Sequence, residues 1–168
     1  MDDLDRRSLL KLIGSAPVAA GFVWTEAEAQ QAHHQAQAAK VLEGLIKNDE
    51  NNLEALKTVA RLRLALGERQ QALDALQASF FISPFDYKLH TQAGELSVEL
   101  KDYSRALTEF QVALALAPPN IAEANYNVAM AFHALGRQPE AKRSVLRALE
   151  AAPRYDKAQE LLLRIVGQ

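Results

Sequence analysis

The 168-residue sequence contains no cysteine and has little excess charge of either sign. Without thiols the chain cannot form disulfides, hold an iron–sulfur cluster through thiolates or use a cysteine nucleophile. The 19 Lys and Arg residues nearly balance the 21 Asp and Glu residues, which gives a formal net charge of −2. A balanced charge argues against nucleic acid or anionic lipid as a partner attracted by a general electrostatic field.

The sequence also lacks an apolar run long enough to cross a bilayer. The longest candidate is the run from Leu12 to Trp24, which contains no charged residue. As a helix it would be about 20 Å long, whereas the hydrocarbon core of a membrane is about 30 Å thick. Gly14 and Pro17 interrupt it further. A stable transmembrane anchor is therefore not expected here.

The order of residues around this stretch is instead typical of an export leader. Arg6, Arg7 and Lys11 precede the apolar run, and the small-residue pattern Ala27-Glu28-Ala29 follows it. The segment 5–11 resembles the twin-arginine (Tat) export motif, although Asp5 replaces the usual Ser or Thr. The resemblance implies a signal peptide over residues 1–29, cleavage after Ala29 and a periplasmic or cell-envelope location in a bacterium. Contact with the membrane would be transient, through the leader alone.

Two alternatives to a cleaved leader stay open. The first is a basic patch beside a buried helix, and the second is a leader that is retained as a weak anchor. Removal of residues 1–29 takes away three basic and five acidic residues, which leaves equal numbers of each sign in the segment 30–168. A neutral chain of that length fits one compact domain or one short repeat array.

Three kinds of marker residue recur along the chain at a nearly constant interval. Alanines and prolines repeat after about 34 residues, and two glycines stand two such intervals apart. The markers are Ala72, Ala106 and Ala141; Pro84, Pro118 and Pro153; and Gly67 and Gly136. Between them, apolar residues follow the i, i+3, i+4, i+7 spacing of amphipathic helices. Each interval therefore predicts a helix A, a tight turn, a helix B and a proline-marked exit.

This pattern resembles the tetratricopeptide repeat (TPR) family. The resemblance implies an all-α fold, a right-handed α-solenoid of three helix-turn-helix repeats with a preceding helix and a C-terminal capping helix. Lys101 departs from the family pattern at a turn glycine, and Leu56, His90 and Asn125 replace the usual early tryptophan. The expected segments are 30–52 for the preceding helix, 53–86, 87–120 and 122–155 for the repeats, and 156–168 for the cap. In the preceding helix we expect Ala38, Leu42 and Leu45 to face inward.

No polar constellation in the sequence indicates catalysis or a metal site. His33 and His34 are expected in a solvated, frayed terminus, and Glu95 and Glu99 on a solvated helix face. His90 and His133 are expected to have surface or packing roles. Core packing is expected for four aromatic residues at a repeat junction, namely Phe80, Phe81, Phe85 and Tyr87. The chain is therefore predicted not to be an enzyme and to need no cofactor or metal.

The TPR resemblance further implies that helices A line a groove that binds a peptide or helix of another protein. Carried onto this sequence, the predicted groove residues are Lys57, Arg61, Leu64, Gln92, Glu95, Glu99, Tyr126, Asn127 and Met130. The two cations would hold an acidic group, the amides would bond to peptide backbone, and Tyr126 and Met130 would be apolar anchors. Glu123 and Asn127 stand where a chaperone-tail carboxylate clamp needs basic residues, so a mixed-charge partner is expected instead.

The sequence thus predicts an exported, non-catalytic protein-interaction scaffold. An alternative is an accessory or assembly subunit of an exported redox enzyme such as a dehydrogenase, because the Tat route often carries folded, cofactor-loaded complexes. Solvated helix faces with no preferred partner, and the detached start of a longer repeat protein, are further alternatives. The sequence indicates neither the partner, the oligomeric state nor the pathway served.

Overall fold

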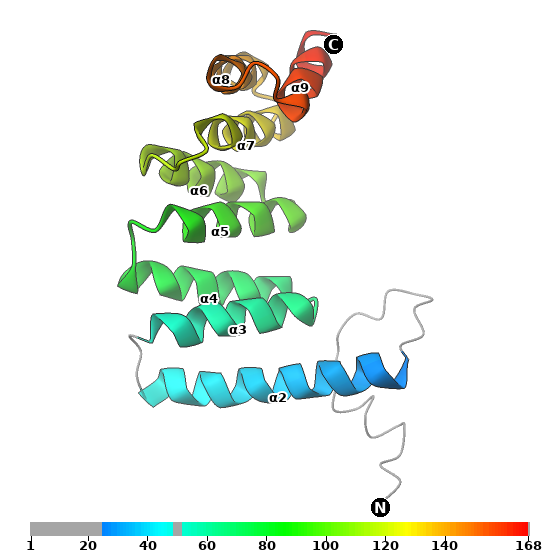
Figure 1. Ribbon diagram of the computed structural model, residues 1–168, viewed down its shortest axis with the longest axis vertical. Helices are drawn as coiled ribbons and strands as arrows, with labels where there is room; N and C mark the ends of the chain where they lie inside the picture. Colours follow the sequence, from blue (N-terminus) through cyan, green and yellow to red (C-terminus); the bar gives the residue numbers. More distant parts are fainter. Residues whose placement is uncertain (1–24, 49–51, 168) are drawn as a thin grey trace, which may run out of the picture. The chain divides into compact units, whose positions relative to one another are not determined.

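The computed structural model describes residues 25–48 and 52–167, and within these ranges every regular element is a helix. The described residues form eight helices and no strand, and Figure 1 shows how these helices follow one another. Their bounds are α2 Glu26–Asn48, α3 Leu53–Ala65, α4 Arg69–Ile82, α5 Tyr87–Glu99, α6 Tyr103–Ala115, α7 Ile121–Ala134, α8 Gln138–Ala151 and α9 Asp156–Val166. The predicted export motif of Arg6, Arg7 and Lys11 lies outside the described residues.

Helices α3, α5 and α7 end in the same hydrogen-bonded turn. After α3, the Glu68 N–H donates to the Arg63 carbonyl over 2.8 Å and the Gly67 N–H donates to the Leu64 carbonyl over 2.9 Å. This is the Schellman pattern, which needs a left-handed residue directly after the helix. Gly67 has φ 75° there, and Lys101 adopts φ 62° at the corresponding place after α5. The lysine therefore replaces the glycine without changing the turn.

Side-chain caps mark the beginnings of four helices. Each cap is an Asn or Asp whose side-chain oxygen accepts a hydrogen bond from a backbone N–H two or three residues further on. The capping residues are Asn52, Asp86, Asp102 and Asn120. Local chemistry thus fixes where these helices begin, as the turns fix where α3, α5 and α7 end.

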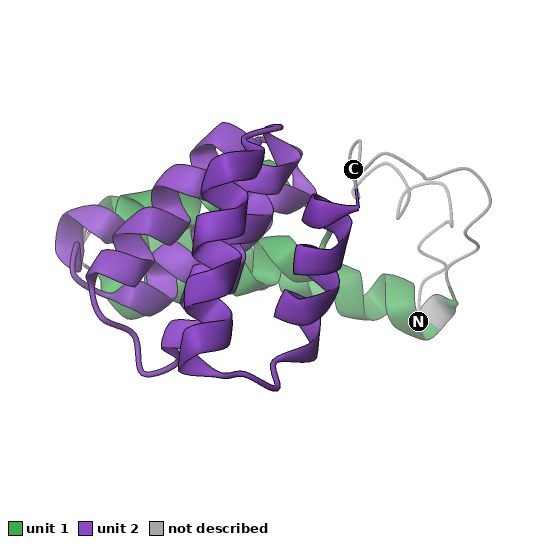
Figure 2. Ribbon diagram, turned by 90° about the horizontal axis from the view of Figure 1, so that it is seen from above, with its two compact units in different colours: residues 1–78 green, residues 79–168 purple. Residues whose placement is uncertain are grey.

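The chain divides into two compact units, residues 1–78 (unit 1) and residues 79–168 (unit 2), which Figure 2 distinguishes by colour. In unit 1, α2 packs along α3. In unit 2, each of α5 to α8 packs on the next helix along the chain, and α9 contacts both α7 and α8. Helix α4 crosses the division and contributes to both units.

Small residues line the contacts between paired helices. Ala72, Ala106 and Ala141, the recurring alanines of the sequence pattern, are all fully buried. In unit 2 they are joined by bulky side chains such as Phe110, which is only 1% exposed. Close helix approach is possible because alanine adds almost no side chain at the crossing. The predicted role of these alanines is confirmed.

Helix α2 differs from the prediction in both its start and its buried face. It begins at Glu26, where the Glu28 N–H donates to Thr25 Oγ1 and the Thr25 N–H donates to the Glu28 carboxylate. This capping box extends the helix through His33 and His34, which were expected in a frayed terminus. Ala39 is fully buried, whereas Leu45 is half exposed and Ala38 is exposed. The predicted inward face was wrong, because α2 packs on α3 through the neighbouring helix face, which includes Ala39.

Two of the four junction aromatics are also placed differently from the prediction. Phe81 is 94% exposed and Phe85 is 82% exposed, so neither packs in the core. Phe80 is half-buried and stacks on His90, with ring centroids 4.3 Å apart. Adjacent residues point about 100° apart on a helix. With Phe80 turned toward His90, Phe81 must turn away from it.

Candidate functional site

The predicted groove residues fall in both units, and each unit is described by itself. In unit 1, Lys57, Arg61 and Leu64 lie on α3 at the i, i+4, i+7 spacing of one helix face. Arg61 is exposed and its guanidinium donates to Thr58 Oγ1 over 3.2 Å, while Leu64 is 41% exposed. Lys57 Nζ lies 3.6 Å from Glu54 Oε1 in a surface ion pair. This face offers cations beside an aliphatic side chain, which suits an acidic group of a ligand.

Arg63, two residues further along α3, has a different role. Its side chain is only 15% exposed, and its guanidinium bonds the carboxylates of Glu43 on α2 and Glu68 in the following turn. Burial opposes the charge of Arg63, but the hydrogen bonds and charges of the two carboxylates outweigh it, so the pKa of Arg63 is raised. Arg63 therefore fastens α2 to α3 and is not available to a ligand.

In unit 2, α5 and α7 carry three carboxylates whose charges act on one another. Gln92, Glu95 and Glu99 are exposed on α5, and Glu123 is exposed in the first turn of α7. Partial burial raises the pKa of Glu95, and the nearby charges of Glu123 and Glu99 raise it further. The sequence placed Glu95 and Glu99 on one helix. The proximity of Glu123 results from the packing of the repeats.

A pair of tyrosines lies near one of these carboxylates, that of Glu123. The rings of Tyr126 and Tyr155 meet edge to face with centroids 5.4 Å apart. Partial burial and the charges of Glu123 and Tyr126 raise the pKa of Tyr155. Next to Tyr155 is a hollow of about 520 Å³, which is lined by Asn120, Ala122, Ala152, Pro153, Arg154 and Tyr155. An aromatic pair with phenol groups can contact apolar or cationic side chains.

Tyr155 was missed by sequence reasoning, although the sequence carries a signal for it. Asn52, Asp86 and Asn120 cap the successive A helices α3, α5 and α7, and Tyr155 takes the corresponding place before α9. Tyr155 makes no side-chain cap to α9. Tyr155 thus departs from the capping pattern of the earlier A helices.

Three further predicted groove residues on α7 are less accessible than expected. Tyr126, Asn127 and Met130 are half-buried, and both Tyr126 and Met130 pack against the core of unit 2. They can present an edge to a ligand but not a whole side chain. The apolar contribution of this face is therefore smaller than an exposed tyrosine and methionine would give.

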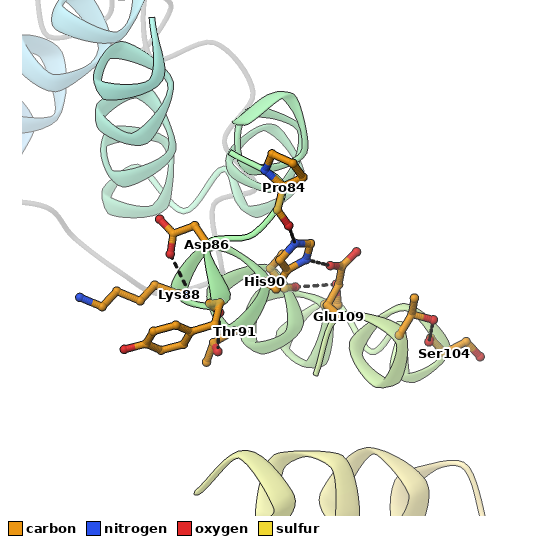
Figure 3. A network of polar contacts seen from close by, with 11 residues as sticks. Pro84, Asp86, Lys88, His90, Thr91, Ser104 and Glu109 are labelled. Carbon is orange, nitrogen blue, oxygen red and sulfur yellow. Dashed lines mark hydrogen bonds and ion pairs between the residues drawn. The ribbon is translucent and has the colours of Figure 1, made fainter. Parts of the chain in front are cut away.

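His90 belongs to a buried polar network in unit 2, shown in Figure 3. Its Nδ1 lies 2.7 Å from a carboxylate oxygen of Glu109 on α6, and its Nε2 lies 3.0 Å from the Pro84 carbonyl. The side chain is 8% exposed. Both neighbours are hydrogen-bond acceptors, so the ring donates to both only when both nitrogens carry protons. The network joins the α4–α5 connection to α6, which is the packing role predicted for His90.

Other predicted features are located without indicating chemistry. Ala27 and Ala29, the predicted cleavage residues, lie in the first turns of α2. Among the described residues, no group of three or more His, Cys, Asp or Glu is arranged to hold a metal ion. None of the described helices combines the length and apolar character needed to cross a bilayer.

Neither a protein-family model nor a curated protein sequence matches this chain. Solved structures of similar fold do exist. The crystal structure of MamA superposes with a TM-score of 0.70 at 16% identity, over 86% of this chain and 85% of MamA. The first TPR domain of Spaghetti (RPAP3), solved with the HSP90 peptide SRMEEVD, gives 0.62 at 24% identity, over 71% and 94% of the two chains.

A third similar structure is YrrB, described as a TPR protein with an unusual peptide-binding site. It gives a TM-score of 0.62 at 18% identity, over 76% of this chain and 66% of YrrB. Identities this low establish a shared fold rather than a shared function. The helix order, the repeated turns and these structural likenesses together show that the chain has the all-α tetratricopeptide-repeat solenoid fold.

Proposed function

We propose that this protein is a non-catalytic scaffold that binds a peptide or helical segment of another protein on its helix-A faces. The observation that carries the proposal is the exposed polar face of the A helices α3 and α5, which stands apart from their buried alanines. Recurring alanines of the B helices are fully buried, while Arg61, Gln92 and Glu95 on the A helices project into solvent. Two proteins of similar fold, RPAP3 and YrrB, are described as binding peptides.

Each face supplies a different chemistry to such a ligand. In unit 1, Arg61 and Lys57 suit an acidic side chain, and Leu64 adds an aliphatic contact. In unit 2, Gln92 is exposed and can bond to peptide backbone, beside the carboxylates of Glu95 and Glu99. Polar positions fix the orientation of a ligand, and the apolar contacts stabilise its bound form. The cations of unit 1 suit an acidic group of a partner, and the carboxylates of unit 2 suit a basic group. A partner with charges of both signs therefore offers one suitable group to each face.

Site-specific photo-crosslinking tests this function. A photoreactive amino acid replaces Gln92 on the A-helix face of α5 in one variant and Gln111 on α6 in the control, since both positions are exposed. Cells expressing each variant are irradiated, and the adducts are identified by mass spectrometry. A defined adduct from position 92 that is absent from position 111 is expected. The same adducts from both positions, or none from position 92, would contradict the proposal.

We further propose that the protein is exported by the Tat route, on the strength of Arg6, Arg7 and Lys11 in the sequence. Cleavage after Ala29 would remove Thr25 and Glu28, the capping box of α2, and the helix would then start near Gln30. Export of wild type but not of Arg6→Lys/Arg7→Lys, followed by fractionation and intact-mass measurement, tests route and cleavage together. Normal export of the double variant would contradict the Tat route, and an intact N-terminus would contradict cleavage.

A role as accessory or assembly subunit of an exported redox enzyme stays a prediction of the sequence. It requires the crosslinked partner to be a dehydrogenase or a similar enzyme. The photo-crosslinking experiment therefore separates the two roles by the identity of the adduct.

A further inference from the structure

Helix α2 has an apolar stripe on a side that α3 leaves uncovered. Ala38, Val41 and Leu45 share this side through their i, i+3, i+7 spacing, and all three are exposed, Val41 to 65% and Leu45 to 50%. Two repeat intervals after Ala38, Ala106 of α6 is fully buried. Ala113 of α6 stands at the place of Leu45 and is also buried. The same stripe is thus covered in a complete repeat and open in α2.

In the second repeat, this side of the B helix packs on the A helix of the same repeat. A carboxylate oxygen of Glu109 on α6 lies 2.7 Å from Nδ1 of His90 on α5. The ring of Phe110 on α6 lies against Gly94 on α5. Helices α7 and α8 of the third repeat also pack on each other. Helix α2 is therefore a B-type helix whose A-facing side is not covered by any other described helix.

Helix α9 has the complementary open side. Gln159, Leu163 and Val166 share one side through their i, i+4, i+7 spacing, and all three are exposed, Leu163 to 73% and Val166 to 61%. Counted from the residue before each helix, they take the places of three buried residues of α5, namely His90, Gly94 and Ser97. Two of those residues contact α6, as described above. Helix α9 is therefore an A-type helix whose B-facing side is open in the described part of the chain.

We propose that the protein assembles head to tail, with α9 of one copy packing against α2 of a second copy. The two helices together supply the helix A and helix B of one further repeat, which is shared between two molecules. The repeat register carries the choice of occupant, because the open A-type side of α9 corresponds to the side that a B helix covers in α5. Burial of the exposed leucines and valines of both helices drives the association.

The contact differs in two ways from the pair inside a repeat. Leu163 is larger than Gly94 at the corresponding place, so we expect α9 and α2 to lie further apart than α5 and α6. The contact also joins two different faces, and such heterologous contacts continue into rings or filaments. This assembly goes beyond the proposed peptide binding, which uses other exposed residues of the A helices.

Sedimentation velocity of the full chain over a series of protein concentrations tests the proposal. The mean sedimentation coefficient of the wild type should rise with concentration. Leu163→Glu/Val166→Glu (the α9 variant) and Val41→Glu/Leu45→Glu (the α2 variant) each place charges in the apolar contact. Each variant alone should associate at least about tenfold more weakly than the wild type.

Mixing the two variants distinguishes head-to-tail assembly from a symmetric dimer. The α2 variant keeps an intact α9 face, and the α9 variant keeps an intact α2 face. The mixture should therefore form dimers with one copy of each variant, and these dimers should not grow further with concentration. A mixture that sediments as the separate variants do would overturn the inference.

A control variant tests whether any exposed apolar pair would have the same effect. Phe81→Glu/Phe85→Glu changes two exposed phenylalanines outside both faces and should assemble as the wild type does. Circular dichroism should show unchanged helix content in all variants, because the replaced side chains are at least half exposed. The corresponding double alanine variants take the place of any variant that loses helix content.

The remaining outcomes contradict the inference in different ways. Association of the α2 variant but not of the α9 variant would indicate a symmetric contact between two α9 helices. Association that persists in both variants, or is lost in the phenylalanine control, would place the contact elsewhere. A wild type that stays monomeric at every concentration would also disprove the assembly. The scaffold function is judged separately by photo-crosslinking at position 92.

Discussion

The same position of helix A carries opposite charge in the two units. Arg61 on α3 and Glu95 on α5 stand one repeat interval apart, and both are exposed. At the buried positions of these helices, by contrast, the residues stay small or apolar, as Ala60 and Gly94 show. The repeat interval therefore constrains side-chain size inside the fold and leaves charge on the surface free to differ. That freedom gives each unit its own binding preference.

A second corresponding position differs in a more structural way. Arg63 on α3 bonds Glu43 on α2, whereas Ser97 on α5 is fully buried and donates its hydroxyl to the Ala93 carbonyl. An ion pair thus fastens the first helix pair of unit 1. In unit 2 the position is closed off from solvent and carries no charge.

The largest expected effect concerns Gly94, which corresponds to Ala60 in unit 1. A Cβ at Gly94 would lie 2.5 Å from Cε1 of Phe110, whose ring is 1% exposed and cannot move freely. Gly94→Val should lower the free energy of unfolding by about 3 kcal/mol through overpacking. Urea unfolding followed by circular dichroism measures this change.

Two controls sharpen the Gly94 comparison. Leu76 stands one repeat interval before Phe110 and is smaller than phenylalanine. Phe110→Leu should therefore reduce the cost of Gly94→Val by about 1 kcal/mol or more. Gly44 of α2 has no atom within 4 Å of its ideal Cβ, and Gly44→Val should change stability by under about 1 kcal/mol. Equal costs at Gly44 and Gly94 would show that the phenyl ring does not limit the site.

The next largest change in the free energy of unfolding is expected at His90, whose counterpart in unit 1 is the buried Leu56. His90→Leu should lower the free energy of unfolding by about 2 kcal/mol, because Glu109, 13% exposed, loses its partner. The double variant His90→Leu/Glu109→Leu should recover most of this loss, as measured by thermal unfolding. A single variant as stable as the wild type would mean that the network contributes no net stability.

A smaller, stabilising effect is expected at Lys101, which corresponds to Gly67. Lys101 has φ 62°, a left-handed conformation that glycine adopts without steric cost. Lys101→Gly should raise the free energy of unfolding by about 1 kcal/mol, and Gly136→Lys, at the same place after α7, should lower it by a similar amount. Thermal unfolding of both variants provides the measurement. Changes of the same sign in the two variants would contradict the equivalence of the turns.

The smallest change in the free energy of unfolding is expected at Glu95, which is opposite in charge to Arg61 at the corresponding position of unit 1. Its raised pKa means that the folded state holds a proton at pH values where the unfolded chain has lost it. The charge of Glu95 therefore disfavours the fold as pH rises through this range. Glu95→Gln should raise the free energy of unfolding at neutral pH by a few tenths of a kcal/mol, since the site is partly exposed.

This gain should disappear as the pH falls below the ordinary glutamate value of 4.5, where wild-type Glu95 is protonated. Arg61→Gln is the matched control, because arginine keeps its charge over the whole range and its effect should not follow that titration. Melting temperatures of the two variants between about pH 3 and pH 7 test the pair. A gain for Glu95→Gln that persists at the acidic end of this range would rule out charge repulsion as its cause.

The repeat interval in the sequence was enough to predict the helix pairs, the turns between them and the alanines that pack at their crossings. Ala72, Ala106 and Ala141 recur at the repeat interval and are fully buried, because a local interval fixes which residues share one helix face. Lys101 was recognised as a departure from the turn pattern, and its backbone keeps the left-handed turn.

Which face of a helix is buried, and which charges act on one another, depends on how the helices pack. Ala39 rather than Ala38 packs in unit 1, and Phe81 projects into solvent although Phe80 does not. Glu95 and Glu123 belong to different repeats, yet their charges interact because α5 and α7 lie in one packed unit. Periodicity specifies the residues of each face, but only packing against other helices selects the face that is covered and the neighbours it gains.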